Sequence, residues 1–399
     1  MSINQLLEQA QTAYDTADWS SLSQYLQMIL GEDLEQPEIE KNRQHLLELA
    51  LAVLAVGDFQ QRWDVVKVFN RLGKIAIAPL IDILADEDAE EELRWYAARI
   101  LGELKNSEAI APLVELIKTN AREELRMMAA SALGQIGQDA IAALTELLTE
   151  ENTRLLAVRS LCYIREKAII TPLLSVVQDS QVAVRATAIE ALSSFHDTRV
   201  PPILLNALDD VAAPVRKEAV QGLGFRPDLC SELDLVTRLQ PRLYDLNEDV
   251  CCAAASALSR MGCDAAACSL FQVLMSPHTP LKLQLEIIRA LSWVETLSGL
   301  EYLQQAMNQL QSLTLWQEIV RVLGRVQQPQ LTNDATKILL EMLQTGHPAV
   351  NIATVRSAIA LSLGQLGKMQ AVEPLTEMLA DEDDSVRLHA YAALNNLRP

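Results

Sequence analysis

A nine-residue pattern recurs along most of this sequence. It is clearest at residues 184–192, where VRATAIEAL reads V-R-x-x-A-x-x-A-L, and close copies occupy residues 93–101, 125–133, 215–223 and 386–394. A period of about 30 residues is typical of stacked repeats, in which each unit packs only on its neighbours. The pattern therefore predicts one continuous array, whereas a length of 399 residues alone would suggest two or three globular domains. Six weaker copies, spaced with the others at 28 to 40 residues, bring the total to eleven and end at Leu72, Leu161, Leu258, Leu291, Leu323 and Leu363.

Both halves of each repeat indicate a helix. We number the positions of the pattern one to nine; positions one, five, eight and nine fall on one side of a 3.6-residue helix. An x-P-L-x-x-L motif precedes the pattern in several repeats, and proline suits the first turn of a helix. No stretch alternates with period two, so we expect no β-strand. The sequence thus predicts an all-α fold, a right-handed superhelical solenoid of about eleven helical hairpins.

The two ends of the array and one internal segment depart from the regular pattern. Residues 1–60 precede the clear repeats and predict three helices that form an N-terminal cap, or alternatively a small docking module. Residues 61–399 form the predicted solenoid. A less regular segment is expected near residues 275–345, because Gln284 and Trp316 replace the usual arginine and the spacing before Leu363 stretches to 40 residues.

Position two is arginine in seven of the eleven copies, and a short acidic turn precedes it in most of them. A guanidinium can bridge a carboxylate and backbone carbonyls, so we interpret these arginines as structural links between neighbouring units. They are Arg94, Arg126, Arg154, Arg185, Arg216, Arg356 and Arg387. Glycines that follow the last leucine are expected to end the second helix in a left-handed cap. They are Gly73, Gly102, Gly134, Gly224, Gly324 and Gly364.

The charge balance restricts the partners. The chain has 53 acidic and 33 basic residues and a net charge of −20, which would repel a phosphate backbone, so nucleic acid is not expected as a partner. The acidity serves solubility or attracts a basic protein. The polar first five residues show no secretory signal, and the longest apolar run, Leu49 to Val56, is too short to cross a bilayer. We therefore expect a cytoplasmic protein without membrane insertion, with its six cysteines reduced.

The repeated residues resemble HEAT repeats. More narrowly, V-R-x-x-A-x-x-A-L-G with x-P-L-x-x-L resembles the HEAT-like repeats of the E/F-type phycobilin lyases, over roughly residues 60–399. Within that group, GDFQQRW at residues 57–63 and RWYAARILGE at residues 94–103 are similar to a cyanobacterial lyase-related branch that is associated with iron–sulfur homeostasis. The resemblance implies a phycobiliprotein subunit or an iron–sulfur assembly protein as partner. It also implies phycocyanobilin or an iron–sulfur cluster as the cofactor, if there is one.

Catalytic motifs are missing from the sequence. It contains no G-x-S-x-G, no phosphate-binding glycine loop and no H-E-x-x-H. HEAT-repeat hydroxylases of the deoxyhypusine type carry His-Glu dipeptides, and none of the five histidines here is followed by glutamate. We therefore expect no reaction centre; if the chain is an enzyme, the resemblance makes it a bilin lyase.

Five of the six cysteines lie between residues 230 and 268. Of these, Cys251, Cys252, Cys263 and Cys268 are the candidates for a zinc or iron–sulfur site, because clustered thiolates bind such metals. Their spacing matches no closed-site motif, and adjacent helical residues point about 100° apart. Cysteine is also often buried in the core. We expect no metal and interpret these thiols as structural, with the metal site as the alternative.

Positions three and six of the pattern point away from the predicted core, and many of them are apolar. Because the second helices of such solenoids line the concave surface, these residues predict an apolar groove for a partner. Arg99 joins them as a cation for a ligand carboxylate. The alternative is that neighbouring second helices bury these side chains laterally. The candidate partner-binding residues are Trp95, Arg99, Met127, Ile189, Val220, Leu285, Ile288, Val320, Leu388 and Tyr391.

Three hypotheses for the function follow, and we rank them in this order. The first is a non-catalytic scaffold or adaptor that holds a protein in its groove, in phycobilisome or phycobiliprotein biogenesis. The second is a phycobilin lyase or chaperone that attaches a bilin to phycobiliprotein cysteines, with Arg99 on a propionate. The third is an iron–sulfur assembly or iron homeostasis factor.

Overall fold

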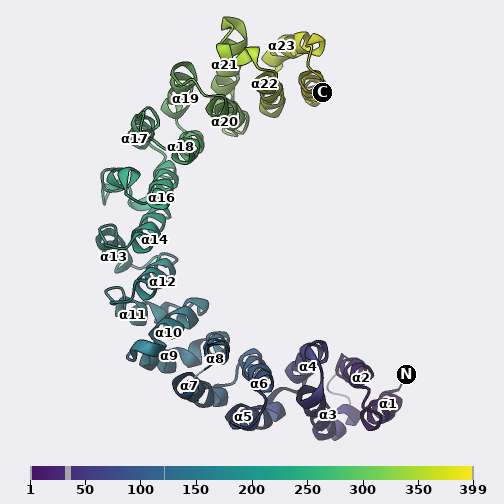
Figure 1. Ribbon diagram of the computed structural model, residues 1–399. Helices are drawn as coiled ribbons and strands as arrows, with labels where there is room; N and C mark the ends of the chain where they lie inside the picture. The colour runs from purple at the N-terminus through teal and green to yellow at the C-terminus, as the bar shows by residue number, and fades with distance from the viewer. Residues whose placement is uncertain (1, 32–36, 121, 398–399) are drawn as a thin grey trace. The chain divides into compact units, whose positions relative to one another are not determined.

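A computed structural model of the chain describes residues 2–31, 37–120 and 122–397, and it contains helices, turns and no strand in these ranges. The chain divides into two compact units, Met1–Ala191 and Leu192–Pro399, which we describe separately. In each unit the helices form hairpins that follow one another in chain order (Figure 1). The prediction of an all-α solenoid is confirmed.

The first unit begins with three helices, α1 (Ile3–Asp15), α2 (Trp19–Gly31) and α3 (Pro37–Val56), as the sequence predicts for residues 1–60. Asp18 caps α2, because its carboxylate accepts the Ser21 N–H at 3.1 Å. The first helices of the next hairpins are α5 (Ile77–Ala85), α7 (Ile110–Thr119), α9 (Ile141–Leu147) and α11 (Ile170–Leu174). The second helices, which carry the nine-residue pattern, are α4 (Phe59–Leu72), α6 (Glu91–Leu104), α8 (Glu123–Ile136), α10 (Glu151–Tyr163) and α12 (Val182–Leu192).

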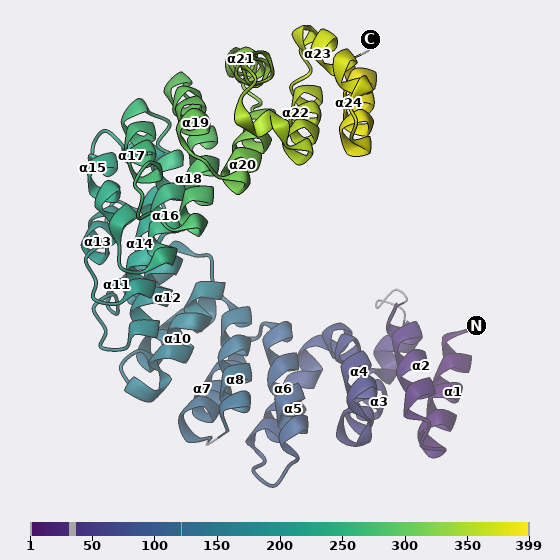
Figure 2. The same ribbon diagram turned by 45° about the horizontal axis from the view of Figure 1, so that its top comes forward.

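The second unit repeats this arrangement. Its first helices are α13 (Val200–Ala207), α15 (Leu235–Leu239), α17 (Asp264–Leu274), α19 (Leu297–Gln309), α21 (Pro329–Thr345) and α23 (Val372–Glu377). Its second helices are α14 (Ala213–Gly224), α16 (Glu248–Ser259), α18 (Leu281–Trp293), α20 (Leu313–Gly324), α22 (Ala353–Leu366) and α24 (Asp384–Leu397). In each unit the second helices lie side by side in one layer and the first helices in another (Figures 1 and 2).

The segment near residues 275–345 is helical. Its extra residues lie mainly in α21, which is 17 residues long, and in a short 3-10 turn at Pro348–Asn351. The indole N–H of Trp316, which replaces the arginine, donates to the carbonyl of Met307 at 3.2 Å. The indole N–H of Trp316 thus takes the place of the arginine as the side-chain donor to a carbonyl near the end of α19.

The core follows the pattern. Positions one, five and nine of α14 are Val215, Ala219 and Leu223, and each is at most 1 % exposed. These apolar side chains fill the space between the two helices of a hairpin and the neighbouring hairpins. Burial of a valine or leucine side chain stabilises the fold by about 1.5–3 kcal/mol.

The glycines after the last leucine do not cap the helices, apart from Gly73, whose φ is +65°. Gly102, Gly134, Gly224, Gly324 and Gly364 lie inside or at the last residue of their helices, so the left-handed cap predicted for them is wrong. They allow neighbouring second helices to approach each other closely. A Cβ at Gly224 would lie 2.8 Å from the Cβ of Ala257 and 2.9 Å from its Cα. A residue with positive φ comes three positions after the glycine in three of these repeats, at Lys105, Gly137 and Gly367.

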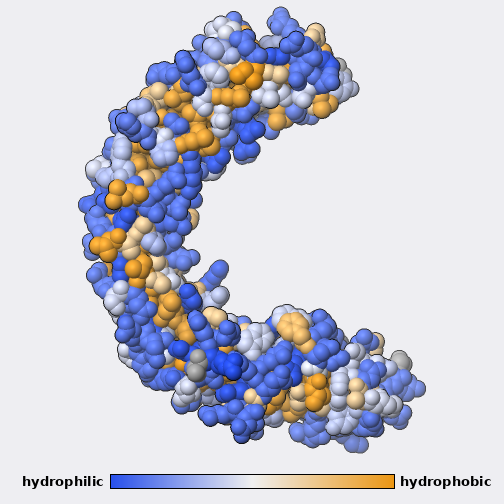
Figure 3. All heavy atoms as spheres, viewed as in Figure 1, coloured by the Kyte–Doolittle hydropathy of each residue, from blue (hydrophilic) through white to orange (hydrophobic). Residues whose placement is uncertain are grey.

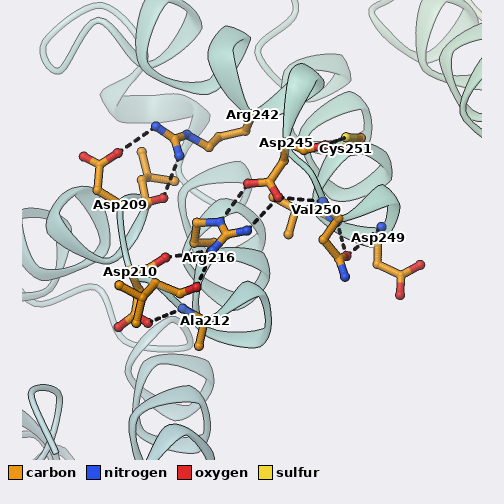
Figure 4. Close-up of polar contacts among 12 residues, drawn as sticks. Asp209, Asp210, Ala212, Arg216, Arg242, Asp245, Asp249, Val250 and Cys251 are labelled. Carbon is orange, nitrogen blue, oxygen red and sulfur yellow. Dashed lines mark hydrogen bonds and ion pairs between the residues drawn. The ribbon is translucent and has the colours of Figure 1, made fainter. Parts of the chain in front are cut away.

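The arginines at position two bind the turn of their own hairpin, and four of them also reach the next hairpin. Arg216 is the clearest case (Figure 4): its Nε and Nη2 each donate to the carboxylate of Asp245 at 2.7 Å, and its Nη1 donates to the carbonyl of Asp210 at 2.8 Å. Asp245 also accepts the N–H of Asn247 at 2.9 Å, which shapes the turn before α16. One guanidinium thus joins two successive turns.

The same link recurs along both units, as predicted. Arg154 donates to Asp179 at 2.5 Å, and Arg356 to Asp381 at 2.6 Å, in each case across one repeat. Arg126 reaches the carbonyl of Asn152 in the next repeat. The remaining arginines of the series hold carbonyls of their own repeat; they are Arg94, Arg185 and Arg387.

We predict that Gly224→Ala lowers the free energy of unfolding by about 1–3 kcal/mol, because the added methyl group has no room against Ala257. Urea denaturation followed by circular dichroism measures the change. The matched control is Gly31→Ala, since nothing lies within 4 Å of a Cβ at that position. Equal stability of the two variants would contradict the close approach.

We also predict an acid-dependent loss of stability that comes from Asp245. Its hydrogen bonds from Arg216 lower its pKa below the ordinary value of 3.8, so the ionised form is favoured in the folded state. This contribution is complete above the ordinary pKa and is lost as the pH falls through the lowered pKa. Denaturation between pH 6 and pH 2.5 should therefore show a smaller loss for Asp245→Asn than for the wild type. The control is Asp209→Asn, because this carboxylate is 78 % exposed and its ion pair with Arg242 is therefore screened by solvent. Identical pH profiles for Asp245→Asn and the wild type would argue against the link.

Candidate protein-binding surface

Lateral packing of the second helices decides which outward positions stay accessible. Position six is buried between neighbouring second helices in every described copy of the pattern except that of α24, so the groove predicted at that position does not form. Five of the candidate residues are at this position. Four of them are 0 % exposed, namely Ile189, Val220, Ile288 and Val320, whereas Tyr391 on α24 is 57 % exposed. These four residues are corrections to the predicted site, and the alternative of lateral burial holds for them.

The other candidates are more accessible. Met127 at position three of α8 is 42 % exposed, while Trp95, Arg99 and Leu285 are half-buried. Leu388 and Tyr391 are exposed on α24, the last helix of the described chain. Figure 3 shows hydrophobic residues in patches separated by hydrophilic ones on the side in view, rather than a continuous apolar strip.

Helices α4 and α6 carry an aromatic–arginine cluster, which consists of Phe59, Trp63, Trp95 and Arg99. The Arg99 guanidinium carbon lies 3.7 Å from the ring centroid of Trp63 and 5.9 Å from that of Trp95. Phe59 stacks on Trp63 with ring centroids 6.1 Å apart. Such contacts hold the cation and both indoles in place. Phe59 is 62 % exposed and Trp63 39 %, so the cluster presents flat apolar rings to solvent.

Buried groups beneath the aromatic–arginine cluster fix α4 against α6. The hydroxyl of the buried Tyr96 donates to the carbonyl of Phe59 at 3.2 Å. Arg62, which is almost fully buried, contacts the carboxylates of Glu90 at 2.6 Å and Glu92 at 3.1 Å. The hydrogen bond from Arg62 lowers the pKa of Glu90, and burial raises the pKa of Tyr96. The exposed rings therefore rest on a rigid, charge-paired support.

Arg99 retains free hydrogen-bonding capacity. Its Nε donates to Glu103 at 3.2 Å. Its two terminal nitrogens have no hydrogen-bond acceptor among the residues that the structure describes. A guanidinium that is held by rings and still has free N–H groups is suited to a carboxylate or a carbonyl of a partner.

The sequence analysis identified only half of this cluster. Trp95 and Arg99 were found from the pattern, whereas Phe59 and Trp63 precede the first copy and were seen only as part of a family likeness. A local signal does exist: both pairs, Phe59 with Trp63 and Trp95 with Arg99, are spaced four residues apart on a helix. Matching those spacings across adjacent helices would have placed the four side chains together.

The structure does not bring the four candidate cysteines together. Cys251 is buried and its thiol donates to the carbonyl of Asp245 at 3.1 Å, while burial raises the pKa of Cys252 to about 11. The Sγ of Cys268 accepts a hydrogen bond from the side-chain amide of Gln272 at 3.7 Å, and Cys263 is half-buried. In the described ranges no three His, Cys, Asp or Glu side chains converge in a way that could hold a metal ion.

The helical hairpins and their arginine–aspartate links define an α-solenoid built from short repeats. The sequence matches the family of HEAT repeats over residues 77–155, 149–224 and 313–395, which together make up more than half of the chain. The chain therefore belongs to the HEAT-repeat family. A search of curated proteins finds no match. Every helix in the described residues is too short or too polar to cross a membrane.

Solved structures show the same fold. Kap121p bound to Nup53p is 15 % identical, with a TM-score of 0.60, 99 % of this chain covered and 49 % of that chain. Kap121p alone gives the same TM-score and identity over 98 % and 49 % of the two chains. This chain thus spans about half the length of Kap121p. Human deoxyhypusine hydroxylase is 17 % identical over 90 % of this chain and 99 % of its own, but a TM-score of 0.29 is too low to support an argument.

Proposed function

We propose that this chain is a non-catalytic scaffold that binds a protein partner through its second-helix layer, with the aromatic–arginine cluster as the main contact. The observation that carries this proposal is the exposure of Phe59 and Trp63 around the held guanidinium of Arg99. Tryptophan and arginine dominate the binding energy of protein interfaces, because they combine apolar area with directed hydrogen bonds.

Composition supports the choice of this cluster. Only 4 % of the residues are aromatic. Three of these few aromatic side chains, Phe59, Trp63 and Trp95, nevertheless lie together in this cluster. The rigid support from Tyr96 and Arg62 reduces the entropy that binding would cost. The structural neighbour Kap121p is bound to Nup53p, which is compatible with a solenoid of this fold acting on a protein.

The named partners rest on the family resemblance. We propose a phycobiliprotein subunit as the first candidate, with a role in phycobilisome or phycobiliprotein biogenesis in the cytoplasm. An iron–sulfur assembly protein is the second candidate, in which case the chain is a factor in cluster assembly or iron homeostasis. No resident cluster is part of this proposal.

A second candidate function is a bilin lyase or chaperone, and Arg99 is the observation that favours it. A linear tetrapyrrole such as phycocyanobilin has a flat apolar body and propionate carboxylates. Trp63 and Trp95 would provide the flat contacts, and the free N–H groups of Arg99 would hold one propionate. Absorption titration of phycocyanobilin into the full chain should then show saturable binding that Arg99→Ala weakens at least tenfold. Equal spectra for both proteins would remove this candidate.

The scaffold proposal predicts that Phe59→Ala/Trp63→Ala abolishes capture of the partner. Removal of such an anchor costs about 2 kcal/mol or more, roughly a thirtyfold loss of affinity. The full chain is used as bait in the cells that express it, and recovered proteins are quantified by mass spectrometry. The matched control is Tyr244→Ala, an aromatic residue that is 62 % exposed in the second unit. Thermal unfolding confirms that each variant is folded.

The outcomes are distinct. A protein recovered with the wild type and with Tyr244→Ala, but lost with the double variant, supports the proposal and identifies the partner. Recovery of the same proteins with all three baits would show that the aromatic–arginine cluster is not the main contact.

A further inference from the structure

The second unit carries a row of alternating aromatic and arginine side chains, which we call the 225–325 row. It consists of Phe225, Arg260, Trp293 and Arg325. Each lies two positions beyond the last leucine of the pattern, so the four residues mark the C-terminal ends of α14, α16, α18 and α20. These four helices follow one another in the second-helix layer (Figure 1). All four side chains are exposed, with Phe225 and Trp293 each at 57 %.

The members of the row contact one another or share a cavity. The Arg260 guanidinium carbon lies 4.6 Å from the ring centroid of Phe225. Trp293 and Arg325 line one cavity of about 370 Å³, together with Arg289 and Leu331. The row is therefore a surface with apolar walls and cations in regular order.

The two arginines of the row have no ion-pair partner. Among the described residues no carboxylate lies within 4.0 Å of Arg260 or Arg325, and their side chains donate no hydrogen bond. Their neighbours differ: Arg226 contacts Asp228 at 2.9 Å, and Arg289 contacts Glu318 at 2.6 Å. Both arginines of the row can therefore pair with an acidic ligand, although the chain has 53 acidic residues and a net charge of −20.

Arg260 and Arg325 lie at the C-terminal ends of α16 and α20. The C-terminal end of a helix has a partial negative charge, and an arginine there offsets it. Among the residues that line the cavity, the carboxylate is that of Glu295, which accepts a hydrogen bond from Gln328 at 2.6 Å. An acidic ligand would thus meet Arg260 and Arg325 first, without displacing an internal ion pair.

We propose that the 225–325 row binds an extended acidic segment of a protein partner. Its carboxylates would pair with Arg260 and Arg325, and its apolar side chains would rest on Phe225 and Trp293. Packed helices lie about 8–10 Å apart, and an extended chain advances about 3.3 Å per residue. The segment therefore alternates an apolar and an acidic residue roughly every third position. This inference rests on the proposed function as a protein-binding scaffold and adds a second contact.

Nucleic acid fits the row less well. Its stacked bases would suit the rings, but its continuous backbone charge would be repelled by the remaining surface of a chain with net charge −20. The proposed acidic segment places only two carboxylates on the row, and each of them faces an arginine, Arg260 or Arg325. Binding of the peptide should weaken as salt is raised, since both pairs are at the surface.

The test uses the full chain and a fluorescein-labelled peptide in which Leu and Asp alternate at every third residue, with Ser between them. Fluorescence anisotropy should show saturable binding, at least tenfold weaker for Arg260→Gln/Arg325→Gln and for Phe225→Ala/Trp293→Ala. The matched control is Arg321→Gln, an arginine that is 58 % exposed on α20 and is expected to leave affinity unchanged. The same peptide with Lys in place of Asp should not bind.

Three results would overturn the inference. They are no saturable binding of the Asp peptide, wild-type affinity in both row variants, and equal binding of the Lys peptide. Tighter binding of a single-stranded oligonucleotide that depends on Arg260 and Arg325 would assign the row to nucleic acid instead. The Phe59→Ala/Trp63→Ala variant should bind the peptide normally. If Phe59→Ala/Trp63→Ala loses the partner but the wild type does not bind the peptide, only the inference about the 225–325 row is wrong. If the wild type binds the peptide but Phe59→Ala/Trp63→Ala still captures the partner, only the proposed main contact is wrong.

Discussion

The link between an arginine of one hairpin and the acidic turn of the next is the interaction on which this structure depends. A HEAT hairpin buries too little apolar surface to be stable alone, so it needs its neighbours. Arg216 ties the turn at Asp210 to the carboxylate of Asp245, and Asp245 in turn shapes the turn that starts α16. Each link therefore organises a turn and sets the position of the following second helix at the same time.

Close stacking of second helices has a direct consequence for function. Because glycines such as Gly224 let helix backbones approach each other, side chains at position six such as Val220 and Ile288 are enclosed between helices. The accessible side chains are those at the edge of each helix and near its ends. Both proposed contacts consist of such residues: the aromatic–arginine cluster on α4 and α6, and the 225–325 row at the ends of α14 to α20.

The fold could be predicted from the sequence because the pattern reports packing within a hairpin. A helical wheel correctly predicts that positions one, five and nine are buried. The acidic turn motif correctly predicts the contacts of the arginines at position two. Lateral contacts depend on the distance between neighbouring helices, which the wheel does not contain. Val220 and Ile288 were therefore assigned to the surface although they are buried, and Gly224 was read as a cap although it is a contact point. The aromatic–arginine cluster combines residues from outside and inside the pattern, so the repeat alone could not reveal it.

A double-mutant cycle at Arg216 and Asp245 tests the central claim most directly. The free energy of unfolding is measured for the wild type, Arg216→Ala, Asp245→Ala and the double variant. If the pair links two hairpins, each single change should cost about 3 kcal/mol, and the coupling energy should exceed about 1 kcal/mol. Additive single effects, with a coupling energy near zero, would show that the hairpins are held together without this link.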